Sequence, residues 1–213
     1  VEYIDSSRKV LDMYINYPIV VKEITAPCVC YEGDGFTVRA FPLEHTKTCV
    51  GYTLEESDRP GEFNPEEALR LKVPRGPLWG KLQHGEKVVA EDGTVVSPEQ
   101  VVGQNRKGRK FSFVTDTLYL PTIAEEVKGS DLLICEGMFA DDCEDQAKEK
   151  KHMTARQAAT IARDSDSKRM ALIHYSPRYN DKDLDVLLQQ AREVYPGARL
   201  SKDRMHIEIP YVE

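Results

Sequence analysis

The second half of the chain alternates short apolar segments with helical patterns. The apolar segments KFSFVTD (110–116), DLLICEGMF (131–139) and RMALIH (169–174) predict buried strands. Between and after them, residues 121–129, 154–166 and 182–197 predict helices, and Thr154 with Gln157 forms a capping box. Alternation of this kind is typical of an α/β protein, in which helices and a sheet pack in layers.

The first half adds one helix pattern and further strand patterns. Apolar spacing predicts a helix over residues 5–14. Strands are predicted for IVVKEI (19–24), FTVRAFPLEH (36–45), CVGYTLEE (49–56) and a closing RMHIEIP (204–210). No apolar run approaches the roughly 20 residues of a membrane-spanning helix, and five scattered cysteines form no disulfide framework. We therefore expect a cytoplasmic protein without a membrane segment.

Residues 58–108 differ from the rest by being rich in proline and glycine. Within them, EKVVAEDGTVV (86–96) predicts a hairpin with Asp92-Gly93 at its turn. From Arg70 to Lys110 there are nine Lys and Arg against four Asp and Glu, although the whole chain carries −7. We expect an arm (58–108) inserted into a main domain (1–57 and 109–213) and suited to a local polyanion contact. The alternative is a solvated loop whose charges serve solubility.

Three predicted strands end in a potential metal ligand: His45, Asp116 and His174. Ligands placed where strands leave a sheet can converge at one rim, a common place for α/β sites. Two imidazoles and a carboxylate suit Zn²⁺ or a similar divalent ion. The alternative is that each histidine is a structural residue, since the three are not close in sequence.

Three further residues could act on a phosphate. His152 precedes the capped helix that starts near Thr154, where a histidine could donate a proton to a leaving oxygen. Arg178 offers a planar fork that matches a phosphate, and Ser176 offers a hydroxyl beside it. The alternatives are a surface position for His152 and a salt bridge for Arg178.

In combination, these motifs resemble the ribonuclease Z family of tRNA 3′-processing endoribonucleases. LEHTKTCVGY, FVTDT, KKHMTARQAATIA and LIHYSPRY occur in the family's order. The segment VPRGPLWGKLQHGEKVVAEDGTVV resembles the family's flexible exosite, with its Gly-Pro motif at Gly76-Pro77 and with Arg75 and Lys81 beside it. The arm separates this family from most other hydrolases of the metallo-β-lactamase fold, so the combination is specific.

The resemblance implies a metallo-β-lactamase fold, an αββα sandwich with two zinc ions at one edge of its sheets. It implies that His45 and His174 each ligate one zinc ion, that Asp116 bridges both, and that His152 assists the leaving group. It also implies that Ser176 and Arg178 match the segment that contacts the scissile phosphate region in this family.

The resemblance also implies a reaction and its partners. The chain would be a zinc-dependent endoribonuclease that removes the 3′ trailer of precursor tRNA by cutting after the discriminator base. The implied partners are precursor tRNA and a second copy of the chain, because in the family one subunit's arm serves tRNA in the other subunit's site.

One family motif is missing from these residues. The H-x-H-x-D-H stretch that carries most of the family's zinc ligands has no counterpart, since the sequence contains no H-x-H and no Asp-His pair. Two ions need about eight ligand positions, some of them filled by water. We therefore expect a fragment with an incomplete metal site and a sandwich incomplete at its N-terminus. The alternatives are a metallo-hydrolase of small phosphodiesters and a non-catalytic tRNA-binding fragment.

Overall fold

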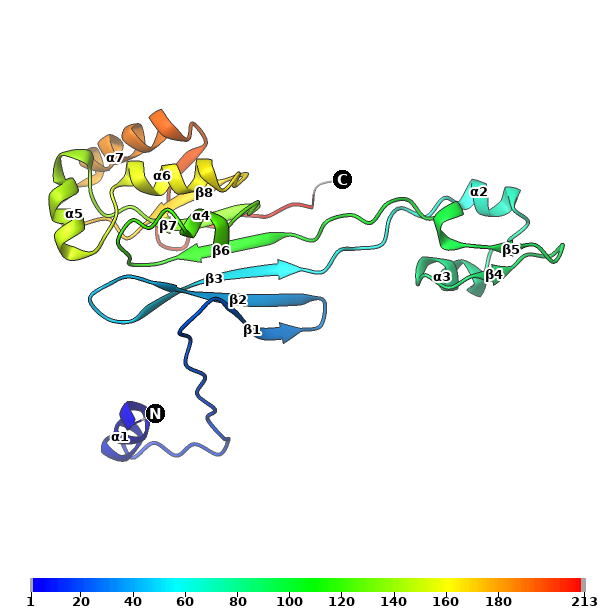
Figure 1. Ribbon diagram of the computed structural model, residues 1–213, viewed down its shortest axis with the longest axis horizontal. Coiled ribbons are helices and arrows are strands. Elements are labelled where there is room, and N and C mark those ends of the chain that lie inside the picture. The colour runs from blue at the N-terminus through cyan, green and yellow to red at the C-terminus, as the bar shows by residue number, and fades with distance from the viewer. Residues whose placement is uncertain (1, 212–213) are drawn as a thin grey trace.

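The computed structural model describes residues 2–211 and contains one seven-stranded mixed sheet with helices packed on one face (Figure 1). The predicted α/β class is confirmed. The strands of this sheet are β1 (Cys28–Gly33), β2 (Phe36–Leu43), β3 (Cys49–Glu56), β6 (Lys110–Val114), β7 (Leu132–Glu136), β8 (Met170–Ile173) and β9 (Ala198–Leu200). The helices outside the arm are α1 (Glu2–Val10), α4 (Ile123–Glu126), α5 (Glu144–Lys150), α6 (Ala155–Asp164) and α7 (Asp181–Val194), with a short 3₁₀ helix at Asp141–Cys143.

The direction of the strands decides where the loops meet. The order in the sheet is β1-β2-β3-β6-β7-β8-β9. Strands β1, β2, β3 and β6 pair antiparallel, whereas β6 to β9 pair parallel. Because β2 and β6 are both antiparallel to β3, β2 points the same way as the parallel strands. The carboxyl ends of β2, β6, β7 and β8 therefore lie at one edge, and the junctions of β3 and β6 with the arm lie at the opposite edge.

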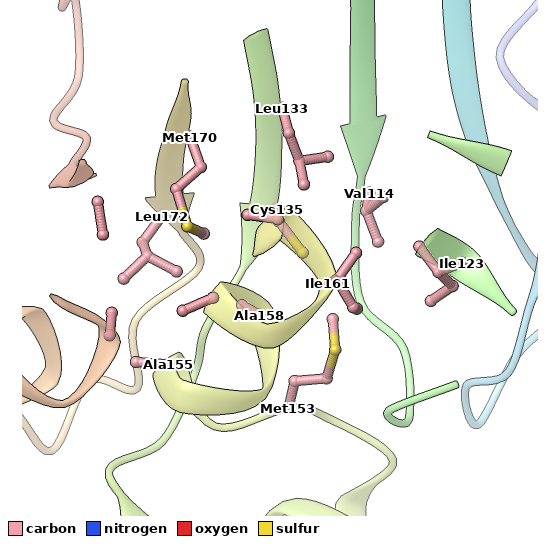
Figure 2. Packing of buried hydrophobic residues seen from close by; sticks show 14 of the residues in the cluster. Val114, Ile123, Leu133, Cys135, Met153, Ala155, Ala158, Ile161, Met170 and Leu172 are labelled. Atoms are coloured by element: carbon pink, nitrogen blue, oxygen red, sulfur yellow. The ribbon is translucent and has the colours of Figure 1, made fainter. Parts of the chain in front are cut away.

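Helix α6 anchors the helical layer on the sheet. It begins at the predicted capping box, where Thr154 Oγ1 accepts the Gln157 N–H at 3.2 Å and Gln157 Oε1 accepts the Thr154 N–H at 3.0 Å. Its alanine-rich face approaches the strands closely, and Ile161 packs among buried side chains of β6, β7 and β8 (Figure 2). Gly137 is needed after β7, because a Cβ there would lie 2.7 Å from a methyl carbon of Leu172.

On the other face of the sheet, the described end of the chain runs as an irregular segment that covers only part of the face. The prediction of a strand over 204–210 is wrong, because β9 is the last strand. The backbone carbonyls of this segment bond to side chains: Arg109 Nη1 donates to Ile209 at 3.0 Å, and Arg169 Nη1 donates to Glu208 at 2.7 Å. The segment borders a groove of about 550 Å³ on the open sheet face, whose sheet side chains are Phe111, Phe113, Leu132, Ile134 and Ile173.

The N-terminal segment was predicted only in part. The helix expected over 5–14 is α1, which begins and ends a few residues earlier. The strand expected over 19–24 is absent, and Val20 is 80% exposed. A β-branched run becomes a strand only where another strand pairs with it. In the described sheet β1 is the outermost strand, and residues 19–24 do not pair with it. Within residues 2–211, no helix is long and apolar enough to cross a membrane.

The chain between β3 and β6 forms a separate unit that projects from the sheet (Figure 1). It contains helices α2 (Pro65–Arg70) and α3 (Pro77–Gln83), the predicted hairpin of β4 (Val88–Val89) and β5 (Val95–Val96), and a short 3₁₀ helix at Pro98–Gln100. Its own core consists of Ala68, Val73, Leu82, Val88, Ala90, Val96 and Val101. Helices α2 and α3 were not predicted for this proline- and glycine-rich region, yet each begins at a proline, and a proline at the first position of a helix favours helix formation.

Candidate functional site

Four of the predicted site residues meet at the edge where β2, β6 and β8 end. His45 follows β2, Asp116 follows β6, and His174 comes directly after β8. His152, between α5 and α6, contributes the fourth side chain: its ring centroid lies 4.7 Å from that of His45 and 5.3 Å from that of His174. Shared strand direction thus brings together side chains that are far apart in sequence.

The tightest group differs from the predicted set of ligands. Donor atoms of His45, Asp116 and His152 all lie within 4.8 Å of one another. His174 joins the group through Asp116, with 3.4 Å between His174 Nε2 and Asp116 Oδ2. His152 therefore lies where it could serve as a metal ligand as well as the predicted proton donor.

A buried carboxylate stands behind His152. Glu136, the last residue of β7, is fully buried, and both of its oxygens lie 3.2 Å from His152 Nδ1. Glu136 also accepts the Thr117 N–H at 2.6 Å. The hydrogen bond to Glu136 raises the pKa of His152 above its ordinary value. Glu136 was not among the predicted site residues, although a carboxylate inside an apolar strand segment needs a buried partner and therefore indicates a polar site.

The other two histidines depend on unusual backbone conformations. Nδ1 of His45 donates to the Lys151 carbonyl at 2.9 Å, which leaves Nε2 as the free ring nitrogen. Lys151 ends α5 with φ +57°, and His174 has φ +62°. Residues other than glycine seldom adopt this left-handed region, and such strain is concentrated at functional sites.

The two predicted phosphate residues lie in the turn after β8. Ser176 is buried, whereas Arg178 is exposed. Arg178 donates to Cys143 Sγ at 3.2 Å and to Gln146 Oε1 at 2.8 Å, and its guanidinium lies 5.1 Å from the Phe139 ring centroid. To bind a phosphate, Arg178 would break its hydrogen bond to the Gln146 amide oxygen and donate to the phosphate in its place.

The donor chemistry at this edge fits a divalent metal ion. His45 and His152 each have Nδ1 bonded to an oxygen acceptor, the Lys151 carbonyl and the Glu136 carboxylate respectively. This arrangement is typical of metal-ligating histidines, because the acceptor fixes the tautomer and the orientation of the ring. Asp116 supplies a carboxylate at the same place.

The predicted exosite residues lie in the arm, at the start of α3. Gly76 is the N-cap of α3 with φ +151°, Pro77 is its first residue, and Lys81 is exposed in its last turn. The exposed Arg75 guanidinium lies 5.8 Å from the ring centroid of Trp79. Because the arm leaves the sheet at the end opposite the four site residues, Arg75, Gly76, Pro77 and Lys81 lie far from them.

Ion pairs neutralise much of the basic stretch. Five of its nine basic residues pair with carboxylates: Arg70, Lys72, Lys107, Arg109 and Lys110. Among the residues that the structure describes, the basic side chains of this stretch without a carboxylate partner are Arg75, Lys81, Lys87 and Arg106. The uncompensated charge is therefore local, and two of these four residues belong to the predicted exosite.

Curated relatives of this chain are ribonucleases Z. The Treponema denticola ribonuclease Z is 63% identical over 210 residues, which are 99% of this chain and 68% of that protein. The Treponema pallidum ribonuclease Z is 57% identical over 212 residues, which are 100% of this chain and 68% of that protein. The chain belongs to the ribonuclease Z family. The match extends over both the arm and the site of this family member.

The fold of this ribonuclease Z family member is confirmed independently. A family model for the beta-lactamase superfamily domain matches residues 82–175. The short form of human tRNase Z aligns with a TM-score of 0.58 at 19% identity, over 98% of this chain and 64% of that one. The metallo-beta-lactamase fold protein YhfI of Bacillus subtilis aligns with a TM-score of 0.53 at 16% identity, over 86% and 52%. The predicted metallo-β-lactamase fold is therefore confirmed, and residues 2–211 hold one sheet and one helical layer of it.

Membership of this superfamily implies that the chain binds a divalent metal ion. The cluster of His45, Asp116 and His152, with His174 beside it, supplies donors of the required kind.

Proposed function

We propose that this chain is part of a zinc-dependent endoribonuclease that removes the 3′ trailer of precursor tRNA. Its own residues would supply only some of the zinc ligands, because they contain no H-x-H-x-D-H stretch. The observation that carries the proposal is the convergence of His45, Asp116, His152 and His174 at one sheet edge. His45, Asp116 and His174 would hold zinc, since imidazole nitrogen and carboxylate oxygen are ligands that Zn²⁺ prefers. When bound, zinc supplies Lewis acidity and lowers the pKa of water.

The remaining side chains act on the phosphate and its leaving group. Water attacks the phosphorus after the discriminator base, and the bond from phosphorus to the 3′ oxygen breaks. Nε2 of His152 donates the proton that this oxygen requires, while Glu136 holds Nδ1 and fixes the ring. Ser176 and Arg178 would contact the phosphate oxygens. The products are a tRNA with a 3′-hydroxyl and a trailer with a 5′-phosphate.

Metal content separates the two possible roles of His152. In His152→Ala, bound zinc should stay at the wild-type level while cleavage falls by about 10²- to 10⁴-fold, the usual contribution of a positioned general acid. In His45→Ala and His174→Ala, bound zinc should fall as well. Elemental analysis of the purified proteins measures this directly. Loss of zinc from His152→Ala would make His152 a ligand and would exclude the general-acid role.

The arm favours a long substrate over a small phosphodiester. It leaves the sheet at the end opposite the site of its own subunit, so it would contact a substrate well away from the scissile bond, and a small phosphodiester could not reach it. Arg75 and Lys81, beside Gly76-Pro77, would contact the phosphate backbone of tRNA. We further propose that the protein is a cytoplasmic homodimer, in which the arm of one subunit holds the tRNA that is cut in the site of the other.

The arm can be deleted at a point where the two segments that attach it to the sheet are already paired. Arg59 and Arg106 exchange both backbone hydrogen bonds, at 2.8 and 2.9 Å, so they can close a two-residue hairpin. Replacing residues 60–105 by Asn-Gly should therefore leave the sheet intact. Affinity for precursor tRNA should fall by about 10²- to 10⁴-fold, the gain that a second linked contact provides. Hydrolysis of a chromogenic phosphodiester should continue at the wild-type rate.

Unchanged tRNA affinity in the arm-deleted protein would remove the support for a tRNA substrate. The same protein also tests the homodimer. Mixed with His152→Ala, which has an intact arm, it should recover cleavage of precursor tRNA if the arm serves the other subunit. A mixture as inactive as its components would contradict an arm that acts across the dimer.

A further inference from the structure

The arm is attached to the sheet by two segments, residues 57–62 and 103–109, which are joined by the isolated bridge between Arg59 and Arg106. We call these two segments the strands of the stalk. The stalk leaves after Glu56 and returns at Lys110. Its strands approach closely, since a Cβ at Gly61 would lie 2.0 Å from the Gly103 carbonyl oxygen. A two-stranded ribbon by itself is marginally stable in water. The direction of the arm therefore depends on contacts beyond the stalk's own backbone pairing.

One aromatic ring contacts both strands of the stalk. The guanidinium carbons of Arg59 and Arg109 lie 3.5 and 4.1 Å from the ring centroid of Tyr211. Nε and Nη2 of Arg59 are buried and have no hydrogen-bond partner in the described part of the chain. Burying these donors without a partner is costly, and the electron-rich ring face compensates for part of that cost. Tyr211 thus holds an arginine from each strand.

The segment that carries Tyr211 is itself fixed to the sheet. Arg169, directly before β8, donates to the Glu208 carbonyl at 2.7 Å. Arg109, directly before β6, donates to the Ile209 carbonyl at 3.0 Å. Apolar side chains of the same segment line the groove on the open sheet face. The sheet, the end of the chain and both stalk strands are therefore connected at one place.

We propose that residues 205–211 form a brace that fixes the direction of the arm, with Tyr211 as its positioning residue. The proposal rests on the proposed function of the arm as the tRNA-binding element. An arm held in one direction presents its RNA contact at a fixed separation from the catalytic edge, which raises the effective concentration of the scissile bond. An arm that swings about the stalk loses that gain. Tyr211 contacts arginines at the end of the sheet from which the arm leaves, opposite the catalytic groups, and would act on the reaction only through the arm.

Kinetics of three variants of the intact protein test the brace. In Tyr211→Ala, KM for precursor tRNA should rise about tenfold, while kcat and the hydrolysis of a chromogenic phosphodiester stay at the wild-type values. Tyr211→Phe keeps the ring over both arginines and should retain the wild-type KM. Tyr17→Ala, which removes a ring that is 62% exposed at a distance from the stalk in sequence, is the matched control and should change nothing. Equal losses of kcat and phosphodiesterase activity in Tyr211→Ala would overturn the positioning role, and so would a KM in Tyr211→Phe as high as in Tyr211→Ala.

Amide hydrogen exchange tests the brace without RNA. In Tyr211→Ala, the amides of Arg59 and Arg106, which pair across the stalk, should exchange about tenfold faster, whereas those of β7 should not change. Unchanged exchange in the stalk would refute the brace whatever the substrate. If the stalk loosens but the wild-type protein does not bind precursor tRNA, the brace stands and the proposed function fails.

Discussion

Replacing Glu136 by glutamine removes one charge and almost no volume from the buried end of β7. In the wild-type protein the Glu136 carboxylate accepts the Thr117 N–H at 2.6 Å and lies 3.2 Å from His152 Nδ1. The glutamine can keep its oxygen on Thr117, but its NH₂ group then faces His152. Nδ1 must become an acceptor, so the ring proton moves to Nε2. A neutral ring in this form cannot give up its Nε2 proton without becoming an anion, and it can no longer act as a general acid.

The expected losses follow from the burial of the pair. A hydrogen bond to a charged group contributes about 1.5 to 3 kcal/mol to the free energy of unfolding. For a chain of this length, that loss lowers Tm by about 5 °C. Loss of the partner that orients a catalytic or metal-bound histidine typically lowers activity by about 10- to 100-fold. Urea unfolding and cleavage of precursor tRNA measure the two effects separately, and the tRNA assay is needed because its leaving 3′ oxygen requires a proton.

Glu149→Gln is the matched control for Glu136→Gln, because Glu149 is an exposed residue of α5. It should match the wild type in both assays. A folded Glu136→Gln protein with wild-type kcat would refute the reasoning, since the pair would then contribute nothing to catalysis.

Three further predictions concern the arm, the core and the pH dependence of stability. The double variant Arg75→Ala/Lys81→Ala should bind precursor tRNA more weakly, and the slope of log binding constant against log salt concentration should become shallower by about 1.5 to 2. Arg70→Ala, which removes a charge already paired with Glu67, should change neither the affinity nor the slope. Ile161→Ala should lower the free energy of unfolding in urea by about 2 to 5 kcal/mol, because the side chain is 1% exposed within the main core; a loss below 1 kcal/mol would contradict the packing of α6 on the sheet. Burial raises the pKa of Tyr175 to about 12 from its ordinary 10.0, so the unfolded chain releases this proton at a lower pH than the folded chain. The free energy of unfolding should therefore fall as the pH rises from about 10 to about 12, and Tyr175→Phe should abolish the contribution of Tyr175 to this fall.

Features that rest on local signals were predictable from the sequence. Thr154 and Gln157 cap α6 as the motif requires, and Asp92-Gly93 lies at the turn between β4 and β5. His45 and Asp116 follow strands that the apolar pattern located, and the shared direction of those strands brings their side chains together.

Features that rest on contacts between distant segments were not predictable in the same way. Val20 lies in a β-branched run that pairs with no strand in the described residues, so its β propensity has no effect. Ile209 was placed in a strand, but its carbonyl bonds to an arginine side chain. Glu136 was read as part of an apolar strand, because only the fold shows that His152 approaches it from another segment. In each case the deciding partner lies far away in the sequence.

The most direct test is to map the products of cleavage of a precursor tRNA by a zinc-loaded protein that carries these residues together with the H-x-H-x-D-H stretch. The account predicts one cut directly after the discriminator base, with a 3′-hydroxyl on the tRNA and a 5′-phosphate on the trailer. Chelation should abolish the cut, and added zinc should restore it. A precursor left intact by protein that still hydrolyses a chromogenic phosphodiester, or a cut that persists after complete removal of metal, would contradict the account.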